Sequence, residues 1–205
     1  MLSTALPDAS QTSPTRLKPL DPTMPITPAT PTTDTSITDT PSASTRPGDE
    51  EIVRQVGALA HLYYEDGQFS CAEAIVRAFA EVFTPHRFDA GSVTRLATPF
   101  NGGFSELQLT CGMLTGGLLA IGMVTGRETP GDEESKEQTY TLTQIYHQRF
   151  VEELGTTSCK ELLTRWKEQG TSKTLCKAHT QRMCERLAKL ILQIGFHELG
   201  DASDS

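Results

Sequence analysis

Four of the five cysteines stand at or beside the predicted starts of helices. Residues 70–73 and 158–161 both read Ser-Cys-x-Glu, the pattern of a capping box, in which serine and glutamate bond the free amides of a first helical turn. An apolar-periodic run follows each, so Cys71 and Cys159 occupy the first helical position. A thiol there meets the positive end of the helix dipole, and we expect its pKa to fall from about 8.5 into a range of roughly 3.5–7.5. Such thiols indicate metal, cluster or redox chemistry.

Cys111 is the first residue of a third apolar run, and Cys176 lies at the start of a fourth. Gaps of 40, 48 and 17 residues separate the four cysteines, and the chain has no Cys-x-x-Cys pair, which structural zinc sites and thioredoxin-like dithiols usually contain. We therefore expect a site built from four converging helix ends. Cys71, Cys111, Cys159 and Cys176 could ligate a [2Fe–2S] or [4Fe–4S] cluster. Alternatively, two of them could close a reversible disulfide, and zinc stays an alternative.

Two further residues near these positions need an interpretation. Cys184 falls in mid-helix beside the apolar stripe of Leu187 and Ile191, so we predict a core residue. His179 lies three residues after Cys176 and is the only histidine close to a predicted ligand. A solvated helical histidine is the ordinary interpretation, with a ligand or a proton carrier as the alternative.

The composition divides the chain into a tail and a domain. Residues 1–48 contain 27 Ser, Thr or Pro and no aromatic residue, which predicts a disordered tail because little apolar area is available for burial. Residues 49–199 form the predicted folded domain, and residues 200–205 a disordered C-terminus.

From residue 49 onward the net charge is −7 with no cationic stripe, which argues against nucleic acid as a partner. No secretory signal is visible, the longest apolar stretch (113–124) is too short for a membrane span, and we expect a cytoplasmic protein.

Helical periodicity runs through the whole domain, and no segment alternates as a strand does. The expected helices cover residues 49–64, 70 to just before Pro85, 92–97, 111–124, 133–154, 158 towards 170, and 176–194. The helix from Cys111 is rich in glycine and apolar on most sides, so we expect a central buried helix that a neighbouring backbone or bulky group approaches closely. The predicted fold class is all-α, an irregular or orthogonal bundle of five to seven helices.

The motifs together resemble a known family. Ser-Cys-Ala-Glu-Ala from residue 70, a Gly-Gly loop, Thr-Cys-Gly-Met-Leu-Thr-Gly-Gly at 110–117, Ser-Cys-Lys-Glu-Leu-Leu at 158–163 and Cys176 before a last amphipathic helix follow the order of the C_GCAxxG_C_C family. These small prokaryotic proteins are described as redox-active. The resemblance covers about residues 50–195 and implies a four-cysteine site, with an iron–sulfur cluster or a redox-active thiol set, on Cys71, Cys111, Cys159 and Cys176.

Three functions follow as hypotheses. The leading one is a redox protein that binds an iron–sulfur cluster through the four cysteines and passes electrons to a partner protein. The second is a metal-free thiol–disulfide oxidoreductase in which two of the cysteines cycle. The third is a non-redox helical binding module whose cysteines hold zinc or only pack. The sequence does not decide whether the protein is an enzyme.

Overall fold

The computed structural model describes residues 48–65 and 67–193, and within these ranges the regular structure is helical. The elements are α1 (Asp49–Glu65), α2 (Cys71–Phe83), α3 (Ala90–Ala97), the 3-10 helix η1 (Thr98–Phe100), α4 (Asn101–Phe104), α5 (Gly112–Thr125), α6 (Glu133–Leu154), α7 (Cys159–Glu168) and α8 (Ser172–Gln193). No strand occurs among the described residues, and the predicted all-α fold class is confirmed. Except for Gly48, the predicted tail lies outside the described residues, and so does the segment 200–205.

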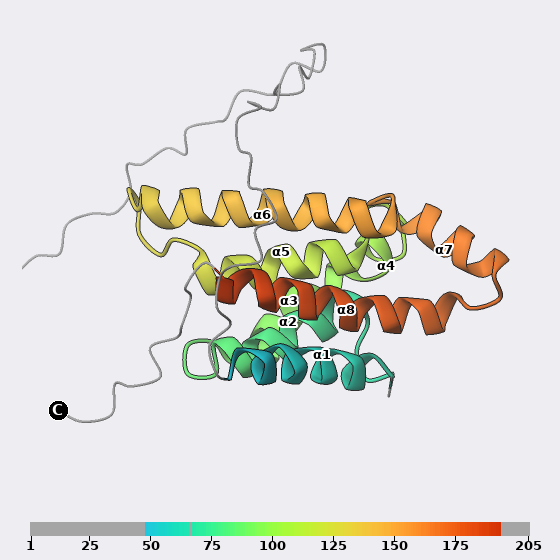
Figure 1. Cartoon of the computed structure of the whole chain (residues 1–205), viewed down its shortest axis with the longest axis horizontal. Helices are drawn as coiled ribbons and strands as arrows, with labels where there is room; N and C mark the ends of the chain where they lie inside the picture. The colour runs from blue at the N-terminus through green and yellow to red at the C-terminus, as the bar shows by residue number, and fades with distance from the viewer. Residues whose placement is uncertain (1–47, 66, 194–205) are drawn as a thin grey trace, which may run out of the picture. The chain divides into compact units, whose positions relative to one another are not determined.

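The helices pack around α5 (Figure 1). α1 lies along α8 and also contacts α2, α2 packs against α5, and α6 packs against the other side of α5. Ten of the 14 residues of α5 are buried, so the expected central helix is confirmed. None of the helices in the described ranges is long and apolar enough to cross a bilayer.

The glycines of α5 allow other groups to approach its surface. A Cβ atom added at Gly116 would lie 2.9 Å from the Cα of Ala72, and one added at Gly117 would lie 2.3 Å from the ring of Tyr146. The Tyr146 hydroxyl donates a hydrogen bond to the carbonyl of Met113 at 3.1 Å, which satisfies its polar group in the core. At Gly122 nothing lies within 4 Å, so the expected close approach is confirmed for the first part of the helix only.

The largest differences from the prediction are at α8 and at the Gly-Gly loop. α8 begins at Ser172 rather than near Cys176, because the turn at Gly170 (φ 71°) ends α7 and no helix breaker follows it. The predicted Gly-Gly loop forms α4, which follows η1 directly, and Gly102 and Gly103 in it have φ values of 62° and 70° and are left-handed. Apart from α4, the described residues form seven α-helices, within the predicted number.

Candidate functional site

The four cysteines predicted as site residues all line one cavity, of about 170 Å3. An engineered protein cavity of about 150 Å3 takes up benzene, so this volume suits a small ligand or cofactor. The remaining wall contains both polar and apolar residues: Tyr64, Ser70, Asn101, Gly102, Glu106, Met113, Leu162, Leu163 and Trp166. The cysteines come from α2, α7, α8 and the residue before α5, so the cavity exists only when these segments are packed together.

Cys111 and Cys159 are brought together by backbone hydrogen bonds between two segments far apart in the sequence. The amide of Cys111 donates to the carbonyl of Thr157 at 2.8 Å, and the amide of Cys159 donates to the carbonyl of Leu109 at 2.7 Å. These bonds flank an isolated antiparallel bridge between Thr110 and Ser158. Ser158 also accepts the amide of Glu161 and so begins α7 as predicted. The two thiols therefore meet on the cavity wall, with Cys111 preceding α5 as its N-cap residue.

Cys71 occupies the first position of α2, where the predicted capping box is present. The Ser70 amide donates to the Glu73 carboxylate at 3.0 Å, and Glu73 also accepts the hydroxyl of Thr98. Asn101 accepts the amide of Ala72 through its side-chain oxygen at 3.2 Å. The start of α2 is thus tied to the segment 98–102, whose Gly102 amide donates to the Cys71 sulfur.

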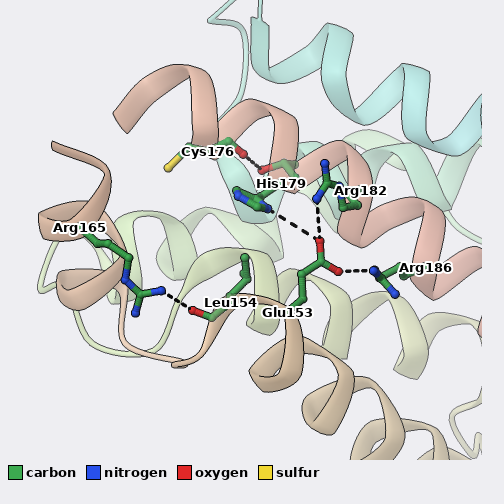
Figure 2. A network of polar contacts seen from close by, with 8 residues as sticks. Glu153, Leu154, Arg165, Cys176, His179, Arg182 and Arg186 are labelled. Atoms are coloured by element: carbon green, nitrogen blue, oxygen red, sulfur yellow. Dashed lines mark hydrogen bonds and ion pairs between the residues drawn. The ribbon is translucent and has the colours of Figure 1, made fainter. Parts of the chain in front are cut away.

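Cys176 reaches the cavity from the second turn of α8 rather than from a helix N-terminus. Its thiol forms a side-chain hydrogen bond with the hydroxyl of Tyr64, near the end of α1. Its carbonyl accepts the hydroxyl of Thr180 at 2.8 Å, while its sulfur points away from the ion pairs further along α8 (Figure 2). The close packing of α1 against α8 is what places Tyr64 beside Cys176.

A left-handed turn forms one wall of the cavity. The five residues 102–106 all have positive φ, although three of them, Phe104, Ser105 and Glu106, are not glycine. The left-handed conformation costs about 1–2 kcal/mol for each such residue, so surrounding contacts must hold it. The amides of Gln108 and Leu109 donate to the carbonyls of residues 102 and 103. The carbonyls of Gln108 and Leu109 in turn accept hydrogen bonds from the first amides of α7.

The expected lowering of the thiol pKa is found for Cys159 but is wrong for Cys71. Burial raises the pKa of Cys71, and the Gly102 amide offsets this only in part. Burial, followed by the nearby Cys71, raises the pKa of Cys176 to about 12. Cys111 donates a hydrogen bond to Cys159, which together with burial raises the pKa of Cys111 and lowers the pKa of Cys159. Desolvation therefore outweighs the helix dipole, and the one lowered pKa arises from a neighbouring thiol.

His179 does not line the cavity but lies directly behind its wall. Its ring stacks on Trp166, with centroids 5.1 Å apart and planes 9° from parallel. Its Nδ1 is 3.9 Å from a carboxylate oxygen of Glu153, which also pairs with Arg182 and Arg186 (Figure 2). Burial, and then the charge of Arg182, lowers the pKa of His179, while Glu153 acts in the opposite direction. The predicted solvated position is wrong for this histidine, because its side chain is only 17% exposed.

Several cavity residues carried no signal in the sequence. Tyr64 ends an ordinary amphipathic helix, and Glu106 follows a Gly-Gly pair with no recognisable motif. Trp166 was predicted as a core anchor, and it is indeed 5% exposed, but it also lines the cavity. Cys184 is fully buried in the main core cluster, as predicted.

The donor set suits a group that prefers sulfur, since four thiols surround the same space. Among residues 48–65 and 67–193, no three or more His, Cys, Asp or Glu side chains are grouped closely enough to hold a metal ion. The four cysteines line the cavity without forming such a group. The Cys71 sulfur packs closely on Gly112, because a Cβ there would lie 2.4 Å from it.

The order and spacing of these cysteines are those of a known protein family. Residues 69–191 match the family described as "Putative redox-active protein (C_GCAxxG_C_C)". The chain belongs to this family. The matched region covers more than half of the chain and includes all four cavity cysteines, so the resemblance seen in the sequence is confirmed. No curated protein and no solved structure matches the chain.

Proposed function

We propose that this C_GCAxxG_C_C protein binds an iron–sulfur cluster through Cys71, Cys111, Cys159 and Cys176 and transfers electrons to a partner protein. The observation that carries the proposal is that these four cysteines, and no other cysteine of the described residues, line a single cavity. Four cysteine thiolates are the usual ligand set of [2Fe–2S] and [4Fe–4S] clusters. When bound, such a cluster supplies one-electron redox chemistry.

The surroundings of the thiols support a cluster more than a single zinc ion. Zinc needs its four ligands about 2.3 Å from one point, whereas a cluster spreads its ligands around a core of several atoms. Among the described residues no three cysteines lie close enough together to share one metal ion, which favours the second arrangement. The Gly102 amide already donates to the Cys71 sulfur, and hydrogen bonds of this kind to ligating sulfurs tune the potential of a cluster. Leu162 and Trp166 add apolar side chains to the lining of the same space.

A second function rests on the contact between Cys111 and Cys159. Cys159 has the lowered pKa that favours a nucleophilic thiolate, and its hydrogen-bonded neighbour could act as the resolving thiol. The Cys159 thiolate would attack a substrate disulfide and release the first substrate thiol. Cys111 would then attack the Cys159 sulfur of the mixed disulfide and release the second. The substrate would leave as two thiols, and an internal disulfide would remain. This function needs no metal.

The deciding experiment is anaerobic purification with iron supplied, followed by a visible spectrum and by iron and sulfide analysis of the same sample. We expect a brown protein with about equal iron and sulfide, and a Cys111→Ser variant that loses iron while keeping its helical circular dichroism. Cys184→Ala is the matched control, because Cys184 lies in the core away from the cavity, and this variant should retain iron.

Other outcomes separate the alternatives. Unchanged iron in Cys111→Ser would contradict the assignment of that ligand. A colourless protein that loses two free thiols on mild oxidation, with Cys111 and Cys159 joined in the peptide map, would support the oxidoreductase. A colourless protein that binds stoichiometric zinc would support the third hypothesis.

A further inference from the structure

A second cavity, of about 300 Å3, lies on the opposite part of α8 from Cys176, between that helix and α6. It is lined by Arg149, Arg182, Glu185, Arg186, Lys189 and Gln193. We call this cavity the cationic groove. Four of its six lining residues carry positive charge, although residues 49–205 together have a net charge of −7. In a concave site lined by cations, the local electrostatic potential is positive even though the net charge of the protein is negative.

The spacing of the cations explains why they face the same space. Arg182, Arg186 and Lys189 are separated by four and three residues, so they form one stripe along α8. Arg149 comes from α6, one helical turn before Glu153. Glu153 has a side chain only 10% exposed and pairs with both Arg182 and Arg186, as Figure 2 shows. This carboxylate pairs with two guanidinium groups that line the groove.

The remaining two cations are not neutralised within the described part of the chain. No ion pair links Arg149 or Lys189 to a carboxylate among residues 48–65 and 67–193. Glu185, the acidic residue of the groove lining, accepts a hydrogen bond from the amide of Gln181. With Glu153 included, four cations face two carboxylates, so the groove keeps an excess of about two positive charges.

We propose that the cationic groove binds a small oxyanion with two or more negative charges, of the class of phosphorylated or polycarboxylic metabolites. Guanidinium groups bind phosphate and carboxylate oxygens in pairs, which suits a ligand with several such oxygens. The volume is at the lower limit of small-molecule sites, which run from about 300 to 1,000 Å3. The net charge of −7 over residues 49–205 disfavours a long nucleic acid, so a small ligand fits better.

The test is isothermal titration calorimetry of the full chain with pyrophosphate as the probe, at low ionic strength, where exposed charges are least screened. We expect one saturable site, and weaker binding of inorganic phosphate because it carries less charge. An Arg149→Gln/Lys189→Gln variant should bind pyrophosphate at least about ten-fold more weakly, since hydrogen bonds to charged groups are lost. Lys167→Gln/Lys173→Gln is the matched control, because it removes the same charge from exposed positions outside the groove and should bind as the wild type does.

Two comparisons complete the design. Citrate, tested in the same way, distinguishes a polycarboxylate ligand from a phosphorylated one, and saturable binding of either probe that depends on Arg149 and Lys189 supports the site. The proposal is overturned if neither probe binds, or if the groove variant and the control variant lose affinity equally. It is also overturned if an acidic protein or a nucleic acid binds the groove and neither small probe does. None of these readouts depends on iron, so this site and the cysteine site can fail independently.

Discussion

The sulfur of Cys71 occupies the space that a side chain at position 112 would need, because a Cβ built on Gly112 would lie only 2.4 Å from it. The same Cβ would lie 2.9 Å from the carbonyl oxygen of Phe100, so movement of the cysteine alone would not relieve the clash. The first residue of α5 and the first residue of α2 are therefore fitted to each other at the cavity.

Gly112→Ala should destabilise the protein and displace Cys71. Overpacking costs about 1–3 kcal/mol, which exceeds the gain of about 1 kcal/mol from alanine in a helix. Urea unfolding measures the change, and iron content measures the effect on the proposed site. Gly122→Ala is the control in the same helix, because open space surrounds that position, and it should be neutral or stabilising by up to about 1 kcal/mol. Equal stabilities of the two variants would contradict the fit of Gly112 to Cys71.

Ser105→Gly should stabilise the left-handed turn. Ser105 has φ 50° and ψ 50°, a conformation that costs a residue with a side chain about 1–2 kcal/mol more than it costs glycine. Ser105→Ala is the matched control, since both changes remove the hydroxyl that donates to the carbonyl of Pro99. We expect the glycine variant to be more stable than the alanine variant by about 1 kcal/mol in thermal unfolding. The reverse order would show that the turn carries no such strain.

Glu153→Gln should destabilise the contact between α6 and α8 by about 2 kcal/mol, because it removes a buried charge shared by two arginines and a histidine. Glu152→Gln changes the neighbouring exposed residue, which bonds Gln148 along the same helix, and should stay within about 0.5 kcal/mol of the wild type. Chemical denaturation of both variants makes the comparison. A loss of similar size in both would mean that Glu153 has no special role.

The pKa of His179 predicts a pH dependence of stability. Burial lowers the folded-state pKa below the usual value of about 6.5, so in the range between them the unfolded chain binds more protons than the folded one. Stability from this group is thus present above pH 6.5 and is lost as the pH falls through the folded-state pKa. We expect His179→Gln to reduce the loss of stability between pH 7.5 and 5. The exposed His147→Gln should leave that loss unchanged, and an equal pH dependence in all three proteins would contradict the assignment.

The same histidine gives an NMR test of the network around Glu153. Because the carboxylate of Glu153 favours the charged imidazolium, Glu153→Gln should lower the pKa of His179 further. The imidazole proton shifts of His179, followed against pH, measure the change. A raised pKa in this variant would mean that Glu153 does not face the ring in solution.

Local signals in the sequence were enough to predict most helices. α6 begins and ends where predicted, because Asp132 caps its start and Gly155 (φ 76°) ends it, and both are short-range effects. The capping box at Ser70 and the N-cap at Ser158 likewise placed Cys71 and Cys159 at the first position of their helices, although the Ser158 amide donates to Thr156 and not to Glu161.

Features that depend on distant contacts were missed. Nothing in the residue types of Phe104, Ser105 or Glu106 indicates positive φ, since contacts with α7 hold that turn. The pKa values of Cys71 and Cys176 could not be predicted for the same reason. The dipole of a helix is a local effect, whereas burial, which raises both pKa values, is set by the whole fold. Tyr64 was missed because its role depends on the packing of α1 against α8.

The four cavity thiols also have a consequence for how the chain folds. Cys71 and Cys176 are 105 residues apart, and the cysteines between them divide that length into loops of 40, 48 and 17 residues. A single group bound by all four sulfurs would close the three loops at once and act as a long-range crosslink, restricting the unfolded chain as disulfides do. Protease resistance of the domain should therefore rise and fall with the occupancy of the cavity.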